Sequence, residues 1–200
     1  MAVAWRPDPF EPPGEATDAA DVALEALRRR GSPSHDGFAA RLVDFETAPE
    51  RLSLELQPAR WALRLIPVGA AHSLSVLCMV RAADGRWLAG RRAQWLASWA
   101  GRWALGAGGS VEVDENPTQA MARELHEEWS VEPEQMSIEA LLRLPSDVVV
   151  LLGQAWLADG ATVIPDDEHD EFAWWPVDVR QWPPEADEPL RRVASLLAAG

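Results

Sequence analysis

The 200-residue sequence contains no lysine or tyrosine and only one cysteine. A single cysteine cannot form an intramolecular disulfide or a thiolate metal cluster, so the composition does not call for an oxidising compartment. Positive charge is also scarce, because 18 arginines face 32 acidic residues and the formal net charge is −14. Duplex binding depends on neutralising phosphates with basic side chains, so a nucleic acid polymer is not expected as a partner.

Long apolar runs are absent as well. No stretch approaches the ~18 consecutive apolar residues of a membrane span. Residues 1–13 carry scattered proline and charge rather than an apolar signal segment. We therefore expect a cytoplasmic protein without a membrane partner, and the chain length favours one domain plus an extension.

The first 70 residues divide into two segments. Residues 1–15 are proline-rich without hydrophobic periodicity, which predicts a mobile arm. Residues 16–70 predict an α+β extension, in which Thr17 caps a helix and Gly31 ends it in the left-handed conformation. Alternating leucines predict short strands around residues 52–56 and 63–65. Whether this extension forms a partner surface, for example in a homodimer, stays open.

Residues 71–200 predict an α/β domain with a mixed β-sheet. The apolar run at residues 74–80 and the run at 86–92 flank an Ala-Asp-Gly turn, which is typical of a β-hairpin. A glycine-rich stretch follows. The remaining predicted elements are a helix at 117–129, a strand at 148–157, an acidic loop at 166–171, a strand at 172–177 and a helix at about 189–198.

Three glutamates crowd one face of the predicted helix at residues 117–129. Glu124, Glu127 and Glu128 recur at i, i+3 and i+4. A separate apolar stripe predicts the buried face, and it consists of Met121, Leu125 and Trp129. Like charges at this spacing repel each other, so we expect a cation between the carboxylates. Several oxygen ligands with room for water and phosphate are typical of Mg²⁺.

A longer motif, at residues 109–131, contains this helix. It resembles the 23-residue Nudix box, the signature of the Nudix hydrolase superfamily. The matching positions are Gly109, Glu115, the triplet Arg123-Glu124-Leu125, the pair Glu127-Glu128 and Val131. Ser130 departs from the box, because the family usually has glycine there. The resemblance covers roughly residues 73–197, and it implies a Nudix-like α/β/α sandwich with a mixed sheet beside the N-terminal extension.

The resemblance also implies an activity and a set of roles. The activity is metal-dependent hydrolysis of a nucleoside diphosphate linked to another moiety, with Mg²⁺ or Mn²⁺ as the cofactor and a small nucleotide or diphosphate as the substrate. Glu124, Glu127 and Glu128 would be the metal ligands. Glu112 and the carbonyl of Gly108 would join them.

The resemblance further implies that Arg123 pairs with Glu115 and holds the loop in place beside the helix. The general base stays open between two box glutamates, Glu124 and Glu128, and two glutamates of the acidic loop, Glu168 and Glu171. His169, in the same loop, is expected to be exposed.

Arginine must supply any side-chain cation that contacts the substrate phosphates, because lysine is absent. Arg91 and Arg102 are the candidates, since both lie near the glycine-rich stretch. Trp99 is the candidate for stacking on a nucleobase.

Two other functions are compatible with a Nudix scaffold. Isopentenyl-diphosphate isomerases need a catalytic cysteine near the position of Gly108, whereas Cys78 lies in an apolar strand and is expected to be a buried structural thiol. A non-catalytic ligand-sensing or interaction protein usually carries a degraded box and a DNA-binding module. The complete set of box carboxylates favours the enzyme.

Overall fold

The computed structural model describes residues 1–32, 36–66, 71–96 and 99–198. The chain forms two compact units, which are described separately. The first unit consists of Met1–Val76, Gly109–Ala120 and Leu141–Leu151, and the second of Leu77–Gly108, Met121–Ala140 and Leu152–Gly200. The boundary predicted near residue 70 lies outside the described residues, and the predicted domain limits stay a prediction.

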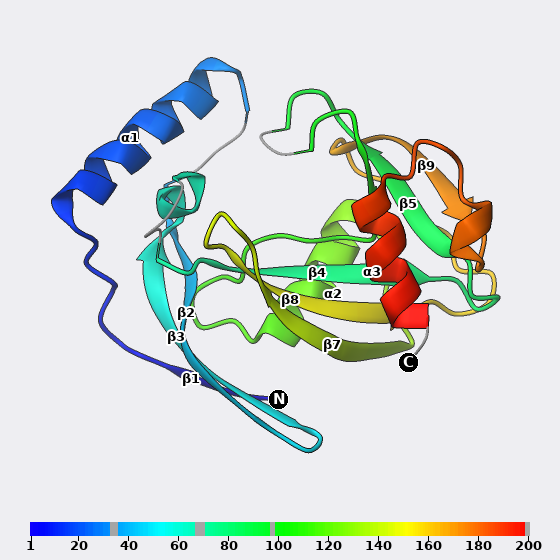
Figure 1. Ribbon diagram of the computed structural model, residues 1–200, viewed down its shortest axis with the longest axis horizontal. Helices are drawn as coiled ribbons and strands as arrows, with labels where there is room; N and C mark the ends of the chain where they lie inside the picture. The colour runs from blue at the N-terminus through cyan, green and yellow to red at the C-terminus, as the bar shows by residue number, and fades with distance from the viewer. Residues whose placement is uncertain (33–35, 67–70, 97–98, 199–200) are drawn as a thin grey trace. The chain divides into compact units, whose positions relative to one another are not determined.

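A three-stranded mixed sheet and a helix make up most of the first unit (Figure 1). Its own elements are β1 (Ala2–Trp5), α1 (Gly14–Arg29), β2 (Phe38–Ala48), β3 (Arg51–Arg60) and the 3₁₀ helix η1 (Trp61–Leu65). β3 lies in the centre, parallel to β1 and antiparallel to β2. Leucine and alanine side chains of α1, β3 and η1 form a buried cluster, which includes Leu24 and Leu63.

Three expectations for this unit are corrected. Residues 2–5 form a strand rather than part of a mobile arm, because they pair with the edge of β3. The segment at residues 63–65 is a 3₁₀ helix that turns Leu63 into the core rather than a strand. Helix α1 begins at Gly14 without a side-chain cap, so Thr17 lies inside it. The left-handed conformation of Gly31 is confirmed, with φ = 75°.

The larger sheet has the strand order β6-β5-β4-β8-β7, and β9 pairs with β5. The elements, in chain order, are β4 (Leu74–Arg81), β5 (Trp87–Arg92), β6 (Trp103–Leu105), α2 (Pro117–Trp129), β7 (Gln135–Arg143), β8 (Val149–Trp156), β9 (His169–Trp175), η2 (Val179–Gln181) and α3 (Glu188–Ala198). The predicted α/β class and the predicted helix at 117–129 are confirmed.

Tryptophan dominates the core of the second unit. Trp87 on β5, Trp175 on β9 and Trp182 after η2 pack against one another and against Leu190 and other apolar residues of α3. The core therefore fixes β9 against β5, and the antiparallel register places Arg91 opposite Glu171. Every described helix is too short or too polar to cross a lipid bilayer.

Candidate active site

Helix α2 starts with a capping box, which the sequence predicts from Asn116 before the helix and Gln119 three residues later. The side chain of Asn116 accepts a hydrogen bond from the backbone N–H of Thr118, and Gln119 accepts one from the N–H of Asn116. The apolar stripe of the helix is completely buried at Met121, Leu125 and Trp129. This packing fixes the rotation of α2 and thereby fixes which direction each glutamate faces.

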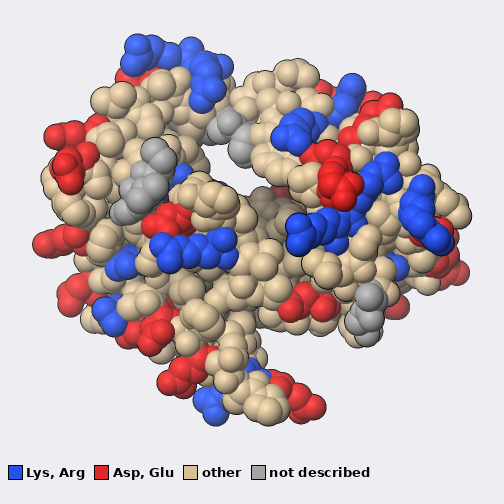
Figure 2. Space-filling model, in the orientation of Figure 1, with Lys and Arg blue, Asp and Glu red and all other residues tan. Residues whose placement is uncertain are grey.

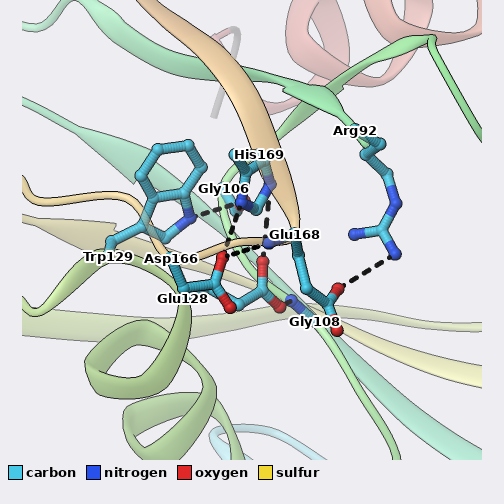
Figure 3. Close-up of polar contacts among 8 residues, drawn as sticks. All are labelled: Arg92, Gly106, Gly108, Glu128, Trp129, Asp166, Glu168 and His169. Atoms are coloured by element: carbon cyan, nitrogen blue, oxygen red, sulfur yellow. Dashed lines mark hydrogen bonds and ion pairs between the residues drawn. The ribbon is translucent and has the colours of Figure 1, made fainter. Parts of the chain in front are cut away.

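Glu128 is the most enclosed carboxylate of the box, with a relative exposure of 4%. Its Oε1 accepts a hydrogen bond from the N–H of Gly108 at 2.9 Å (Figure 3). Its Oε2 is buried and has no hydrogen-bond partner among the described residues. Burial raises the pKa of Glu128 well above its ordinary value, and the negative charges of Glu124 and Glu168 raise it further.

Glu124 and Glu127 both form ion pairs with the guanidinium group of Arg123. Nη1 of Arg123 lies 2.7 Å from Oε1 of Glu124 and 3.1 Å from Oε2 of Glu127. Burial nevertheless raises the pKa of Glu124, and the charge of Arg123 only partly offsets this effect. The expected pairing of Arg123 with Glu115 stays a prediction. Glu115 accepts a hydrogen bond from the N–H of Glu112 at 2.9 Å, which orders that turn.

A loop brings further ionisable groups to Glu128. The N–H of Asp166 donates to the backbone carbonyl of Glu128 at 2.9 Å, so the loop is attached to the end of α2. Glu168 follows, and its Oε2 lies 3.3 Å from Nη2 of Arg92 on β5 (Figure 3). Of the two loop carboxylates proposed from the sequence, Glu168 therefore lies in this cluster. Glu171 instead pairs with Arg91 at 3.2 Å.

The expectation of an exposed His169 is wrong. Its side chain is 1% exposed, and its ring packs against Trp129 with a centroid distance of 4.2 Å. Burial, with a smaller contribution from the charge of Arg92, lowers the pKa of His169 to about 4. His169 is the first residue of β9, so its ring enters the core where the sequence alone indicates only an acidic loop.

Sequence reasoning also missed the positions of Arg92 and Asp166 in this cluster. Consecutive strand residues usually face opposite sides of a sheet, so Arg91 and Arg92 are expected to have different partners, and they pair with Glu171 and Glu168, respectively. That alternation was the available signal. It could not decide which arginine faces the carboxylates, because the choice depends on the register of β5 with β9.

The two predicted phosphate-binding arginines line one pocket. Arg91, Arg102 and Trp103 contribute to a cavity of about 300 Å³ together with Gly101, Glu185 and Asp187. Arg102 also pairs with Asp187. Its guanidinium carbon lies 4.4 Å from the ring centre of Trp99, which is partly exposed. The structure thus brings Arg91 and Arg102 together and stacks Trp99 on Arg102.

The available donor atoms are carboxylate oxygens, which are the type of ligand that a hard divalent cation prefers. Glu128 keeps one buried oxygen to which no described residue donates a hydrogen bond, and Glu124 is a second largely buried carboxylate. Oxygen ligands of this type suit Mg²⁺ and Mn²⁺. In the described part of the chain, however, no three acidic, histidine or cysteine side chains already converge on one metal position. Arg123 supplies the positive charge beside Glu124 and Glu127 in this arrangement.

On the face that Figure 2 shows, blue and red side chains of the described residues alternate in small groups. Such a surface offers no broad basic area for a polyanion on that face. Arg91 and Arg102 instead provide a local concentration of positive charge at the pocket that they line.

The NUDIX domain model matches residues 71–197, which is more than half of the chain. The chain therefore belongs to the Nudix family. It is a hydrolase that acts on phosphorus-containing acid anhydrides.

Solved structures show the same fold at low identity. A MutT Nudix hydrolase from Burkholderia pseudomallei is 22% identical with a TM-score of 0.51, covering 62% of this chain and 95% of its own. The Nudix domain of Shewanella oneidensis NrtR, solved with ADP-ribose, is 22% identical with a TM-score of 0.50 and covers 64% and 89%. The MutT protein of Methanosarcina mazei is 23% identical with a TM-score of 0.49, covering 64% and 93%. Among curated proteins, none matches this chain.

Proposed function

We propose that the protein is a metal-dependent pyrophosphohydrolase that cleaves a nucleoside diphosphate linked to another moiety. The observation that carries this proposal is the enclosed carboxylate of Glu128. One of its oxygens has no hydrogen-bond partner in the described part of the chain, and the carboxylate lies beside Glu124 and Glu168. Holding acidic side chains together away from water costs stability, and such clusters of perturbed pKa are typical of functional sites.

We propose Glu124, Glu127 and Glu128 as the residues that would hold Mg²⁺ or Mn²⁺, with Glu112 and the carbonyl of Gly108 as further ligands. When bound, the cation would withdraw negative charge from the diphosphate and make a water molecule more acidic. Neutralisation by the cation would also lower the raised pKa values of Glu124 and Glu128, since both are raised by burial and by like charge.

The chain's own residues would orient the reactants. We propose that Glu168 accepts the proton of the attacking water, because it projects from a loop next to the box and is held by Arg92. Glu171 is the less favoured base, since it pairs with Arg91 and is not among the charges that act on Glu128, whereas Glu168 is. Arg91 and Arg102 would contact the substrate phosphates, and Trp99 would contact a nucleobase.

The test is a substrate panel with the full-length protein in Mg²⁺ or Mn²⁺. We would measure mononucleotide or phosphate release from nucleoside triphosphates, ADP-ribose and dinucleoside polyphosphates. ADP-ribose is included because it is bound in the NrtR Nudix domain structure. We expect turnover of at least one substrate and a loss of about 100-fold or more in kcat for Glu128→Gln and Glu127→Gln.

Glu132→Gln is the matched control, because Glu132 is exposed and lies just beyond the box. Its kcat should equal that of the wild type. If no substrate turns over, or if Glu128→Gln and Glu127→Gln retain full activity, the enzymatic proposal is wrong. Saturable nucleotide binding without turnover would instead indicate the ligand-sensing alternative.

A further inference from the structure

His169 lies directly against the unpartnered oxygen of Glu128. Its Nε2 is 3.7 Å from Oε2 of Glu128, and both side chains are almost completely buried. This separation is longer than a hydrogen bond, and a shift of about 0.5 Å would bring the two atoms into range. No role for this histidine follows from the Nudix box, because His169 lies 41 residues beyond Glu128 (169 − 128).

The other ring nitrogen faces a second carboxylate. Nδ1 of His169 lies 3.3 Å from Oδ1 of Asp166, the residue whose N–H donates to the backbone of Glu128. Oδ1 of Asp166 also accepts the N–H of Glu168 at 3.0 Å. His169 therefore lies between the end of α2 and the loop that carries Glu168 (Figure 3).

Packing holds the imidazole ring in this orientation. Trp129 covers one face, and its own Nε1 donates to the carbonyl of Gly106 at 3.0 Å. Gly90 on β5 leaves room on another side, since a Cβ there would lie 2.4 Å from Cδ2 of His169 and 2.6 Å from Trp129. A ring enclosed in this way cannot turn its nitrogens elsewhere without displacing its neighbours.

The proton of the neutral ring can serve only one of the two carboxylates at a time. A neutral imidazole carries its single N–H proton on either Nδ1 or Nε2. Oδ1 of Asp166 already accepts a backbone hydrogen bond, whereas Oε2 of Glu128 has no hydrogen-bond partner among the described residues. Leaving a buried acceptor unpaired is costly, so when Glu128 is the charged carboxylate that a metal ion requires, the proton is better placed on Nε2, facing Glu128.

We propose that His169 is a positioning residue that directs its Nε2–H at Glu128 and so fixes the orientation of that carboxylate for metal binding. The inference rests on the proposed function, since it gives His169 a role only if Glu128 acts in the site. Groups that orient a ligating side chain typically change metal affinity or activity by roughly 10–100-fold when they are removed.

Three substitutions of His169 distinguish the effect of each ring nitrogen from the effect of the packing of the ring. His169→Gln places an amide nitrogen near the position of Nε2, and His169→Asn places one near Nδ1. His169→Phe keeps a ring against Trp129 without either nitrogen. The control is His126→Gln, because His126 is an exposed histidine on the same helix α2.

The measurements are the dissociation constant of Mn²⁺ alone, by calorimetry on the full chain, and kcat and KM for any panel substrate that turns over. We expect His169→Phe and His169→Asn to weaken Mn²⁺ binding and lower kcat by roughly 10–100-fold, with a much smaller change in KM. His169→Gln should stay within about threefold of the wild type, as should His126→Gln.

The proposal is overturned if folded His169→Asn binds Mn²⁺ and turns over like the wild type, or if His169→Gln is as impaired as His169→Asn. If His169→Phe does not fold in thermal unfolding, the other two variants decide. If none of the three His169 variants folds, the role of His169 is purely structural, and this result also overturns the proposal. Glu128→Gln separates the failures: wild-type activity there removes the proposed function, whereas its inactivity beside an unaffected His169→Asn removes only this inference.

Discussion

Acidic side chains are held in opposite ways in two regions of the molecule. In the N-terminal sheet, Glu55 on β3 accepts two hydrogen bonds from Arg6 at 2.9 and 3.0 Å, and these bonds lower the pKa of Glu55. Around the end of α2, burial raises the pKa of Glu128 well above its ordinary value. The first arrangement favours the charged carboxylate, whereas the second opposes it.

This difference distinguishes a carboxylate whose charged form is stabilised by an ion pair, Glu55, from a carboxylate whose charged form is destabilised at the candidate active site, Glu128. An ion pair on the surface contributes little to stability, and water solvates both charges, so it does not depend on rigid neighbours. The enclosed group around Glu128 needs rigid neighbours, because its unfavourable environment persists only if the surrounding structure enforces it. Three substitutions can sharpen or break this contrast.

The largest effect is expected from Gly106→Ala, compared with Gly31→Ala in the N-terminal region. Both glycines have positive φ, 64° and 75°, so both variants carry the strain of a left-handed L-residue, about 1 kcal/mol. Only at Gly106 would the new Cβ also collide with backbone, 1.8 Å from the carbonyl oxygen of Cys78. Among the described residues, no heavy atom lies within 4 Å of a Cβ at Gly31.

Urea unfolding should therefore show a loss of roughly 3 kcal/mol or more for Gly106→Ala and about 1 kcal/mol for Gly31→Ala. Mn²⁺ binding should weaken in Gly106→Ala alone, because Gly106 holds Trp129 and Trp129 packs on His169. Equal losses of stability in the two variants would contradict the idea that the site region is the more tightly constrained one.

An intermediate effect is expected for the pH dependence of stability, measured with a metal chelator present. The folded state holds the proton of Glu128 above the unfolded pKa of this carboxyl, so wild-type stability falls as pH rises above that value. Glu128→Gln removes this loss and keeps an acceptor for the N–H of Gly108. Its stability advantage should therefore grow as the pH rises from the unfolded pKa of this carboxyl toward the folded one, by about 1.4 kcal/mol for each unit by which the pKa is raised.

Glu55→Gln should show the opposite sign. The folded pKa of Glu55 is lowered, so its contribution is present above the unfolded pKa and is lost as pH falls through the folded value. His169, with its pKa lowered to about 4, destabilises the fold in acid between its ordinary pKa and that value. The wild type and Glu55→Gln both lose this stability in acid, so the contribution of His169 cancels when the two are compared. Thermal unfolding at several pH values would contradict the contrast if both variants behaved alike.

The sequence predicted local features well wherever a short pattern determines them. The capping box of Asn116 and Gln119, the buried stripe of α2 and the Asp-Gly hairpin between β4 and β5 were all confirmed. Each depends on residues within a few positions of one another. Strands β2 and β7 were missed, because neither shows a clean alternation of buried and exposed residues.

The environment of the candidate site could not be predicted in the same way. His169 seemed to belong to an exposed acidic loop, and only the pairing of β9 with β5 carries it into the core beside Trp129. The choice of Arg92 over Arg91 as the partner of Glu168 depends on the same pairing. Such contacts join segments that are far apart in the chain, and nothing in the local pattern encodes the register between them.

The smallest effect is expected from Ser130→Gly at the end of α2. Ser130 has φ = 53°, and its N–H donates to the carbonyl of His126 at 2.9 Å, as in a helix end that glycine usually forms. Glu50, at the turn between β2 and β3, has φ = 60°. Glycine should relieve the strain at both positions and stabilise each variant by about 0.5–1 kcal/mol, or roughly 1–4 °C in Tm. Ser195→Gly is the control, because Ser195 lies within helix α3 and glycine there should destabilise by a similar amount.

Because strain at a single residue is local, the two regions should respond alike here. A gain at Glu50 without one at Ser130 would mean that the site region needs its strained helix end, and it would extend the contrast between the two regions to the backbone of the box itself.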